Sequence, residues 1–272
     1  MAADRQYTHL PRPSGGTDHH YGPQVHLLSH PWAMSLLNRL SRTETRQPEV
    51  DLLVGALYDW LFTQVASREL ATRQVSNPTR MAEFTPAGHY SGEAIDPNQS
   101  AVVVDVARAG ILPSARFFQG LNLLLDPDGV RQDHIFMNRE TDTDGTVTGV
   151  NLSGSKIGGP IDGATIFLPD PMAATGSSIS RVFRLYRDDL GQDPRRVVAV
   201  HLIVTPEYLR RITSEFPKVR VYAIRLDRGL SDPAVLDTVP GESWDEEVGL
   251  NEHQYIVPGA GGLGEVLNNA WV

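Results

Sequence analysis

Apolar runs in the second half of the chain indicate the fold class. Five of them, rich in β-branched residues, cover 101–107 (AVVVDVA), 134–138 (HIFMN), 164–169 (ATIFLP), 197–204 (VVAVHLIV) and 219–226 (VRVYAIRL). Segments with the apolar spacing of helices, 179–191 and 206–216, lie between them. Strands that are apolar on both faces and alternate with helices are typical of a parallel sheet covered on each side. The pattern predicts an α/β fold, with a central, mostly parallel sheet of about five strands flanked by helices.

Polar and Gly-rich stretches divide the rest of the chain. Residues 1–25 are rich in Pro, Gly, His and Asp without periodicity, which predicts a flexible N-terminal arm ahead of a single domain over 26–272. Pro48 opens an amphipathic helix with an apolar stripe that includes Leu57 and Leu61, so the N-terminal part is expected to be helical. Residues 141–163 are polar and Gly-rich, and predict a flexible β-hairpin lid.

Composition excludes several classes of protein. The 272 residues carry 24 Lys and Arg against 33 Asp and Glu, a net charge of −9, which argues against non-specific nucleic-acid binding. The sequence has no apolar run of about 18 residues, the length that crosses a membrane. The first thirty residues have no apolar core like that of a secretory signal. The absence of Cys excludes disulfides and a cysteine nucleophile, and a cytoplasmic location fits best.

The sharpest local feature is the segment that follows the apolar run 164–169. Asp170 stands at the predicted strand end, small residues fill 173–178, and a helix begins directly afterwards. Small residues expose backbone N–H groups, the hydroxyls of Thr175 and Ser177 add donors, and a helix N-terminus carries partial positive charge. This combination favours a phosphate-binding loop at the carboxyl end of a strand, where ligands of α/β sheets bind.

The run DPMAATGSS (170–178) resembles the DPMLATGGS loop with which uracil phosphoribosyltransferases bind 5-phosphoribosyl 1-pyrophosphate (PRPP). The resemblance covers roughly residues 30–272. Further motifs follow in the family's order: HPWAMSLLNRL (30–40) resembles the opening HPL helix, ARAGILPSAR (107–116) the LRAG loop, NRET (138–141) the YRxEET segment, TPEYL (205–209) the AAPEG turn, FPKVRVYAIRLDRGL (216–230) the stretch HPDVxxYTAxxDxGL, and GLNEHQYIVPG (249–259) the motif GLNEHGYIVPG.

The resemblance implies a type I phosphoribosyltransferase fold, with a C-terminal hood over 249–272, and a role for individual residues. Catalysis would depend on Asp170 and Arg108. PRPP would be bound by Arg108, Arg139, Asp170, Pro171, Met172, Ala173, Ala174, Thr175, Gly176, Ser177, Ser178 and Gly262. The base would be read by Tyr255, Ile256, Gly261, Gly262 and Leu263, largely through the backbone. Mg²⁺ would arrive with the substrate, so no protein metal site is expected, and a homodimer or higher homo-oligomer is implied.

The hood departs from the family pattern. Where the family reads PGLGDAGDR, this chain reads PGAGGLGEV (258–266), so Gly262 replaces the first acid and Glu265 stands in place of the second. Two interpretations of Glu265 stay open: it bends inward and compensates, or it is a solvated surface acid. A second departure is the insertion 231–248, for which a surface excursion is expected because long loops cost little free energy.

Three functions are consistent with these observations. The first is transfer of phosphoribose from PRPP to uracil, giving UMP and pyrophosphate in pyrimidine salvage. The second keeps the phosphate site but accepts a different base in the altered hood. The third is a catalytically weak homologue that senses nucleotides. Fold alone does not separate them.

Overall fold

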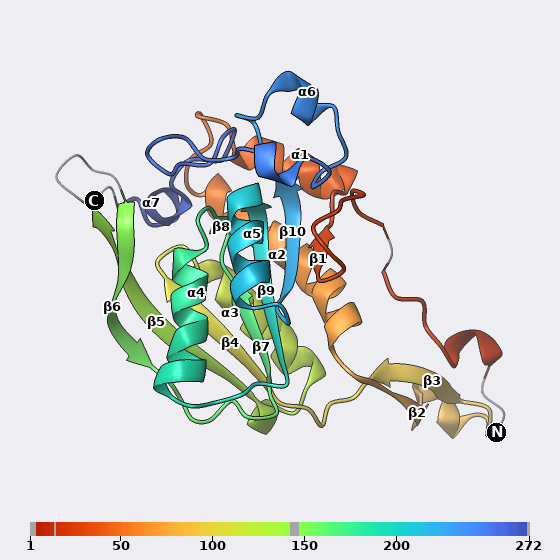
Figure 1. The fold of residues 1–272 in the computed structure, drawn as a ribbon. Coiled ribbons are helices and arrows are strands. Elements are labelled where there is room, and N and C mark those ends of the chain that lie inside the picture. Colours follow the sequence, from red (N-terminus) through yellow and green to blue (C-terminus); the bar gives the residue numbers. More distant parts are fainter. Residues whose placement is uncertain (1–3, 14, 142–146, 271–272) are drawn as a thin grey trace.

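The computed structural model describes residues 4–13, 15–141 and 147–270, and the side chains of these residues outside 138–150. Within this part of the chain, one eight-stranded sheet forms the centre of the molecule (Figure 1). In spatial order its strands are β1 (Val25–Leu27), β10 (Arg220–Leu226), β9 (Arg196–Val204), β7 (Thr165–Pro169), β4 (Ala101–Ala107), β5 (Val130–Thr141) and β6 (Val147–Lys156), with β8 (Met172–Ala173) paired to β9. All neighbours are parallel except β5 and β6.

The five apolar runs of the sequence fall in the five strands β4, β5, β7, β9 and β10, so the predicted α/β class is confirmed. The sheet is wider than predicted because β1 and β6 extend its two edges and β8 adds a short pairing. These three strands were missed for a physical reason. β1 and β8 are too short to show a period, and β6 (VTGVNLSGSK) is a polar edge strand without a continuous apolar run.

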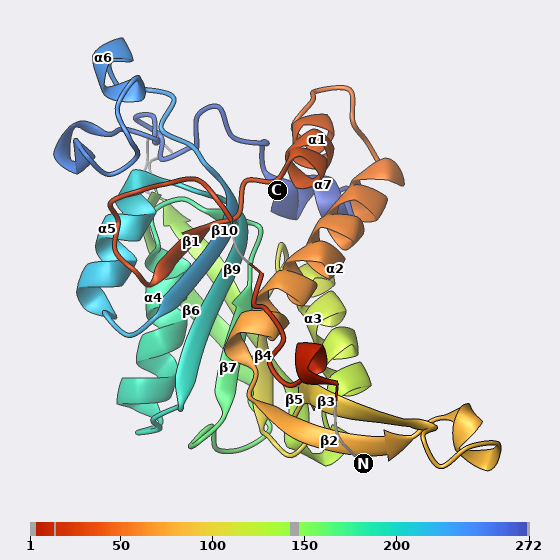
Figure 2. The same ribbon diagram turned by 90° about the vertical axis from the view of Figure 1, so that its right-hand side faces the viewer.

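Helices cover both faces of the sheet (Figure 2). Side chains of α2 and α3 form one apolar cluster with one face, and side chains of α4 and α5 form another with the opposite face. The helices are α1 (Pro31–Leu40), α2 (Glu49–Glu69), α3 (Ile111–Leu124), α4 (Ser177–Arg184), α5 (Pro206–Glu215), α6 (Pro233–Leu236) and α7 (Leu263–Asn268). Short 3-10 turns occur at η1 (Arg5–Tyr7), η2 (Arg80–Glu83), η3 (Pro127–Gly129) and η5 (Trp244–Glu246), and α4 continues into a π-helical turn, η4 (Leu185–Asp189).

A two-stranded hairpin that the sequence did not predict projects from the body of the molecule (Figure 2). It consists of β2 (Thr72–Pro78) and β3 (His89–Ile95), which pair antiparallel with mostly polar, exposed residues. The N-terminal arm contacts this hairpin, because Arg12 pairs with Glu93 at 2.8 Å. The predicted boundary at residue 25 falls on β1, so the arm continues directly into the sheet. Among the described residues before β1, only η1 is helical.

The insertion 231–248 is anchored to the body of the protein by a buried carboxylate. Glu247 is 3% exposed and accepts hydrogen bonds from Arg228 (2.7 Å), from the backbone N–H of Gly241 (2.8 Å) and from the hydroxyl of Tyr21. Trp244 stacks edge-on against Tyr21, with 4.9 Å between ring centroids. The segment lies mostly at the surface, as expected of a surface excursion, and Glu247 and Trp244 pack it on the N-terminal arm.

Candidate active site

Parallel strands bring the predicted site residues to one edge of the sheet. The register pairs Pro169 of β7 with Val200 of β9, and Ala107 of β4 with Phe136 of β5. Because these strands run in the same direction, the residues that follow them, including Arg108 and Asp170, emerge at the same carboxyl edge. The C-terminal loops lie across this edge in Figure 1.

The loop 170–178 connects β7 to α4 as the sequence predicted. Its centre pairs with β9 through β8, and Gly176 is the N-cap residue of α4 with a φ of 79°. That left-handed conformation favours glycine, and a Cβ there would also lie only 3.3 Å from the ring of Tyr208. Thr175 Oγ1 is 2.9 Å from Ser177 Oγ and accepts from the Ser177 N–H at 3.3 Å. The α4 N-terminus and two hydroxyls thus meet in one short turn.

Two carbonyl groups of this loop are turned into the protein. His201 Nδ1 lies 2.6 Å from the carbonyl oxygen of Asp170, and Thr205 Oγ1 donates to the carbonyl of Ala174 at 2.7 Å. The N–H and C=O of a trans peptide point in opposite directions. The Thr175 N–H, which shares a peptide with the Ala174 carbonyl, therefore points away from Thr205.

Arg108 follows β4 directly and is half-buried, and α3 begins three residues further on. The Ala107–Arg108 peptide bond is cis. Beneath this turn, Asp105 of β4 is 3% exposed, and its Oδ2 lies 2.8 Å from His134 Nδ1 on β5. Burial raises the pKa of the Asp105 carboxyl, while the hydrogen bond from His134 opposes that shift.

Arg139 lies on β5, opposite Val150 of β6. Since Ala107 at the end of β4 pairs with Phe136, the Arg139 backbone stands three residues beyond that strand end, on a hairpin that extends past the carboxyl edge. Its side chain lies outside what the structure describes, as do residues 142–146 near the start of the predicted lid. The hairpin itself begins at Val130, earlier than the predicted lid.

The hood is attached to the carboxyl end of β10. Asp227 Oδ2 accepts from the Gly259 N–H at 2.7 Å, and Arg225, itself paired with Asp227, donates to the Gly259 carbonyl at 2.9 Å. A Cβ on Gly264 would lie 3.7 Å from Ala109 Cβ, so the start of α7 adjoins the Arg108 turn. The phosphate loop, Arg108 and the hood therefore surround one edge of the sheet.

The predicted base-binding residues differ in how far they are exposed to solvent. Leu263 is 2% exposed and packs in the apolar cluster that α2 and α3 form with one face of the sheet. The side chain of Tyr255, by contrast, is largely exposed. Contact of Leu263 with a base would therefore come from its backbone. Gly261 and Gly262 are exposed, so their backbone groups are accessible to a ligand.

Glu265 folds back over Gly262. A Cβ built on Gly262 would overlap Glu265 Oε2. Glu265 is the third residue of α7 and Gly262 its N-cap, the spacing at which a glutamate side chain reaches back to the start of a helix. The carboxylate of Glu265 thus occupies the space into which a side chain at position 262 would begin to extend.

Arg211 is a cation next to the phosphate loop that the sequence did not reveal. Arg211 of α5 donates from Nη1 to Ser177 Oγ at 2.8 Å and from Nε to Glu215 at 2.9 Å. The sequence shows Arg211 and Glu215 at the i, i+4 spacing of a helical ion pair. Nothing in that spacing reveals that the guanidinium also reaches a loop 34 residues earlier, because that contact depends on how α5 packs beside α4.

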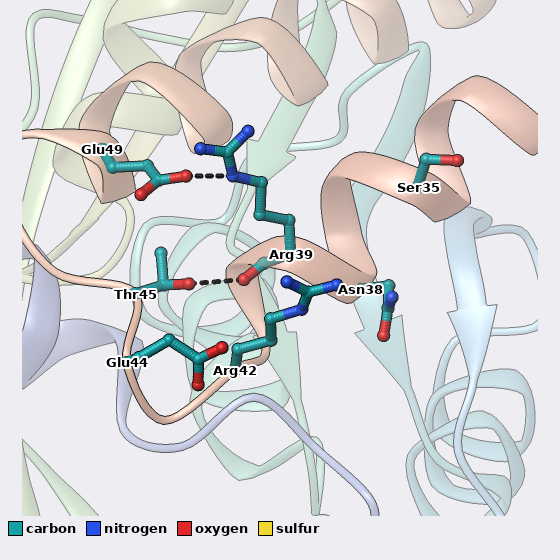
Figure 3. A pocket seen from close by; sticks show the side chains of 7 residues that line it. All are labelled: Ser35, Asn38, Arg39, Arg42, Glu44, Thr45 and Glu49. Carbon is teal, nitrogen blue, oxygen red and sulfur yellow. Dashed lines mark hydrogen bonds and ion pairs between the residues drawn. The ribbon is translucent and has the colours of Figure 1, made fainter.

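A separate cavity of about 470 Å³ lies at the turn between α1 and α2 (Figure 3). It is lined by Ser35, Asn38, Arg39, Arg42, Glu44, Thr45 and Glu49. Arg39 pairs there with Glu49, and Thr45 donates to the Arg39 carbonyl at 2.6 Å. Its two arginines and two glutamates balance in charge, and none of the predicted site residues lines it.

Two further observations concern the described residues alone. None of their helices combines the length and apolar character that a membrane span requires. They also contain no group of three or more His, Cys, Asp or Glu side chains placed to hold a metal ion.

A parallel sheet whose carboxyl edge carries a small-residue loop at a helix N-terminus, an arginine turn and a covering hood is the arrangement expected of a phosphoribosyltransferase. The family model described as uracil phosphoribosyltransferase matches residues 27–243, so the chain belongs to the uracil phosphoribosyltransferase family and is an enzyme of phosphoribosyl transfer. The matched residues end before the hood.

Individual relatives support this assignment. The chain is 28% identical over 243 residues to a uracil phosphoribosyltransferase of Polaromonas naphthalenivorans, and the matched region covers 89% of this chain and 96% of the relative. It is 29% identical over 219 residues to that of Pyrobaculum islandicum, covering 80% and 94%. Among solved structures, the AQ2163 protein of Aquifex aeolicus shares the fold with a TM-score of 0.67 at 20% identity, over 91% of this chain and 99% of that one.

Proposed function

We propose that this enzyme transfers the phosphoribosyl group of PRPP to uracil, giving UMP and pyrophosphate. The bond between ribose C1 and the pyrophosphate oxygen breaks, a bond from C1 to uracil N1 forms, and the N1 proton is lost. The observation that carries the proposal is the loop 170–178, with its α4 N-terminus, at the same sheet edge as Arg108 and the hood. Positioning and charge neutralisation are the main requirements of such a reaction.

In this proposal the residues divide into three groups. Asp170 binds the ribose hydroxyls, and Ala173 to Ser178 hold the 5′-phosphate, as the turned carbonyl of Ala174 supports. Arg108 and Arg139 bind the pyrophosphate, since a planar guanidinium can grip phosphate oxygens in a bidentate way. The backbone of Tyr255, Ile256, Gly261, Gly262 and Leu263 reads the base.

We expect Mg²⁺ to be bound with PRPP. Mg²⁺ prefers oxygen ligands, keeps several waters, and is commonly held by one or two carboxylates together with substrate phosphates. The phosphate oxygens of PRPP would supply such ligands, so the ion would arrive with the substrate and need no metal site built from protein side chains. Mg²⁺ would neutralise part of the pyrophosphate charge, and the protein residues would orient the two substrates.

We also propose that the protein is a homodimer or a higher homo-oligomer. The projecting β2–β3 hairpin carries Met81 and Phe84 near its tip, with 54% and 77% of their surface exposed. Large apolar side chains on a projecting element favour contact with another chain. Light scattering on the purified protein tests the oligomeric state. Cytoplasmic location stays a prediction, which cell fractionation tests.

The test of the proposed reaction is a turnover assay with Mg²⁺, PRPP and uracil, following UMP by chromatography. We expect UMP formation that is lost in Asp170→Asn and kept in a control, Asp59→Asn, whose carboxylate is 58% exposed on α2. PRPP binding without UMP formation would contradict the proposal and favour either a different acceptor base or a nucleotide sensor.

A second candidate function is favoured by one observation in the hood. Because Glu265 occupies the space beside Gly262, the hood presents one carboxylate, on a longer side chain, where the family pattern has two acids. A base other than uracil would then be the acceptor, with the phosphate site unchanged. Turnover with a panel of pyrimidines and related heterocycles distinguishes the two, because the second candidate predicts UMP formation much slower than transfer to another base.

A further inference from the structure

Behind the phosphate loop lies a buried polar cluster formed by His201 of β9 and by Thr205 and Tyr208 at the start of α5. All three residues have 0% exposure. None of them has been assigned a role in the proposed reaction. Buried polar side chains lose their hydration, so each such group requires a hydrogen-bond partner within the protein.

The contacts fix the tautomer of His201. Its Nδ1 lies 2.6 Å from the Asp170 carbonyl oxygen, which can only accept, so Nδ1 carries the proton. Its Nε2 lies 2.7 Å from the Tyr208 hydroxyl and is the acceptor of that O–H. Burial lowers the pKa of His201 to about 4, which keeps the ring neutral at physiological pH. The proton arrangement is therefore unique: Tyr208 donates to His201, and His201 donates to Asp170.

Thr205 completes the cluster at the other end of the loop. Its hydroxyl donates to the Ala174 carbonyl at 2.7 Å and accepts from the Tyr208 N–H at 3.0 Å, as the N-cap of α5. The ring of Tyr208 also lies under Gly176, at 3.3 Å from where a Cβ would be. The cluster thus holds the first residue of the loop, its middle and its last turn before α4.

We propose that His201, Thr205 and Tyr208 are positioning residues for PRPP, which hold the carbonyls of Asp170 and Ala174 inward so that the Asp170 carboxylate and the Thr175 N–H face the ligand. The inference rests on the proposed function, because PRPP is the ligand that the loop would bind. It goes beyond that function, because Tyr208 stands where the family's AAPEG turn has Gly. This chain therefore couples the loop to α5 through a ring that a glycine lacks.

Two double variants test the proposal. They differ in whether the side chain at position 201 can donate a hydrogen bond to the Asp170 carbonyl. In both, Tyr208→Phe removes the hydroxyl that would otherwise be left without a partner. His201→Leu then removes the donor to Asp170, whereas His201→Asn keeps an amide N–H where Nδ1 stood, in a side chain of nearly the same size. Tyr186→Phe is the control, since its hydroxyl is also buried but donates to Asp133, outside the loop, at 2.7 Å.

We expect His201→Leu/Tyr208→Phe to raise KM for PRPP about tenfold, the effect of one lost hydrogen bond, with KM for uracil unchanged. His201→Asn/Tyr208→Phe should stay within about threefold of the unmodified enzyme on the same scale. Equal KM values for PRPP in the two double variants would overturn the proposal, because a purely structural cluster does not distinguish Leu from Asn through Asp170.

Hydrogen exchange measured by mass spectrometry separates this inference from the proposed function. Without any ligand, peptides covering 170–180 should exchange faster in the Leu double variant than in the Asn double variant or in Tyr186→Phe. If the unmodified enzyme neither binds PRPP nor forms UMP, the proposed function fails, yet the exchange result still decides whether the cluster holds the loop. Identical exchange in all variants would overturn the inference even in an active enzyme.

Discussion

The phosphate loop and the hood face the same sheet edge but are held in different ways. The loop 170–178 is fixed from behind by buried hydrogen bonds from His201 and Thr205, and it matches the family pattern closely. The hood is attached through Gly259, while Gly261 and Gly262 are exposed and differ from that pattern. The contrast suggests that recognition of the phosphoribosyl group is constrained by the core, and that recognition of the base is free to change.

The largest effect is expected at the loop itself. Asp170→Asn keeps the shape of the side chain but removes a negative charge that would face the ribose, so turnover should fall about a hundredfold or more, as when other charge-stabilising groups are removed from active sites. The melting temperature should change by only a few degrees, because the residue stands at a strand end. Steady-state kinetics and calorimetry measure the two quantities. A large fall in melting temperature with activity preserved would show that Asp170 serves the fold and not the reaction.

The next largest effect is expected at Arg108, in the turn after β4 at the same sheet edge. Arg108→Ala removes a half-buried cation, and should weaken binding of PRPP by about 10- to 100-fold, the range for a lost charged hydrogen bond. Binding of UMP, which lacks pyrophosphate, should be nearly unchanged. Isothermal calorimetry with both ligands tests this. Equal losses for the two would mean that Arg108 supports the turn without binding pyrophosphate.

The same contrast explains what could be predicted from sequence. The five apolar strands and the loop after β7 were predictable because buried parallel strands are continuously apolar and a phosphate loop needs small residues at a strand end. The hairpin β2–β3 was not, since its pairing is between polar, exposed residues. His201 and Arg211 were missed because their partners lie across elements. A histidine inside an apolar run, VVAVHLIV, was the only available signal for the first of these.

A smaller effect is expected in the hood, and it sharpens the comparison. If Glu265 contacts the base from its folded position, Glu265→Gln should raise KM for the accepted base about tenfold, the usual value of one specific contact, and leave KM for PRPP unchanged. Gly262→Ala should act in the same direction, because its Cβ would displace the Glu265 carboxylate. Kinetics with each substrate varied separately measure both variants. An effect on PRPP alone would place Glu265 with the phosphate site instead.

Acid pH provides the last test of how the loop is held. Burial lowers the pKa of His201 and of His26 to about 4, below the ordinary value near 6.5 that the unfolded chain keeps. Between these values the unfolded chain takes up protons that the folded chain excludes. The free energy of unfolding should therefore fall with decreasing pH, by up to about 1.4 kcal/mol per pH unit for each histidine.

Asp105 acts in the opposite direction. Burial raises its pKa in the folded state, so the folded chain binds its proton more readily than the unfolded chain and gains relative stability as pH falls. The expected net slope is nevertheless a loss, because burial also lowers the pKa of His19, so three histidines oppose one carboxyl. Urea unfolding at a series of pH values between 7 and 4 measures it, and His201→Leu/Tyr208→Phe should show a slope shallower by up to about 1.4 kcal/mol per unit. Equal slopes would mean that His201 titrates in the folded protein as freely as in the unfolded chain, so the loop could not depend on a single fixed tautomer beneath it.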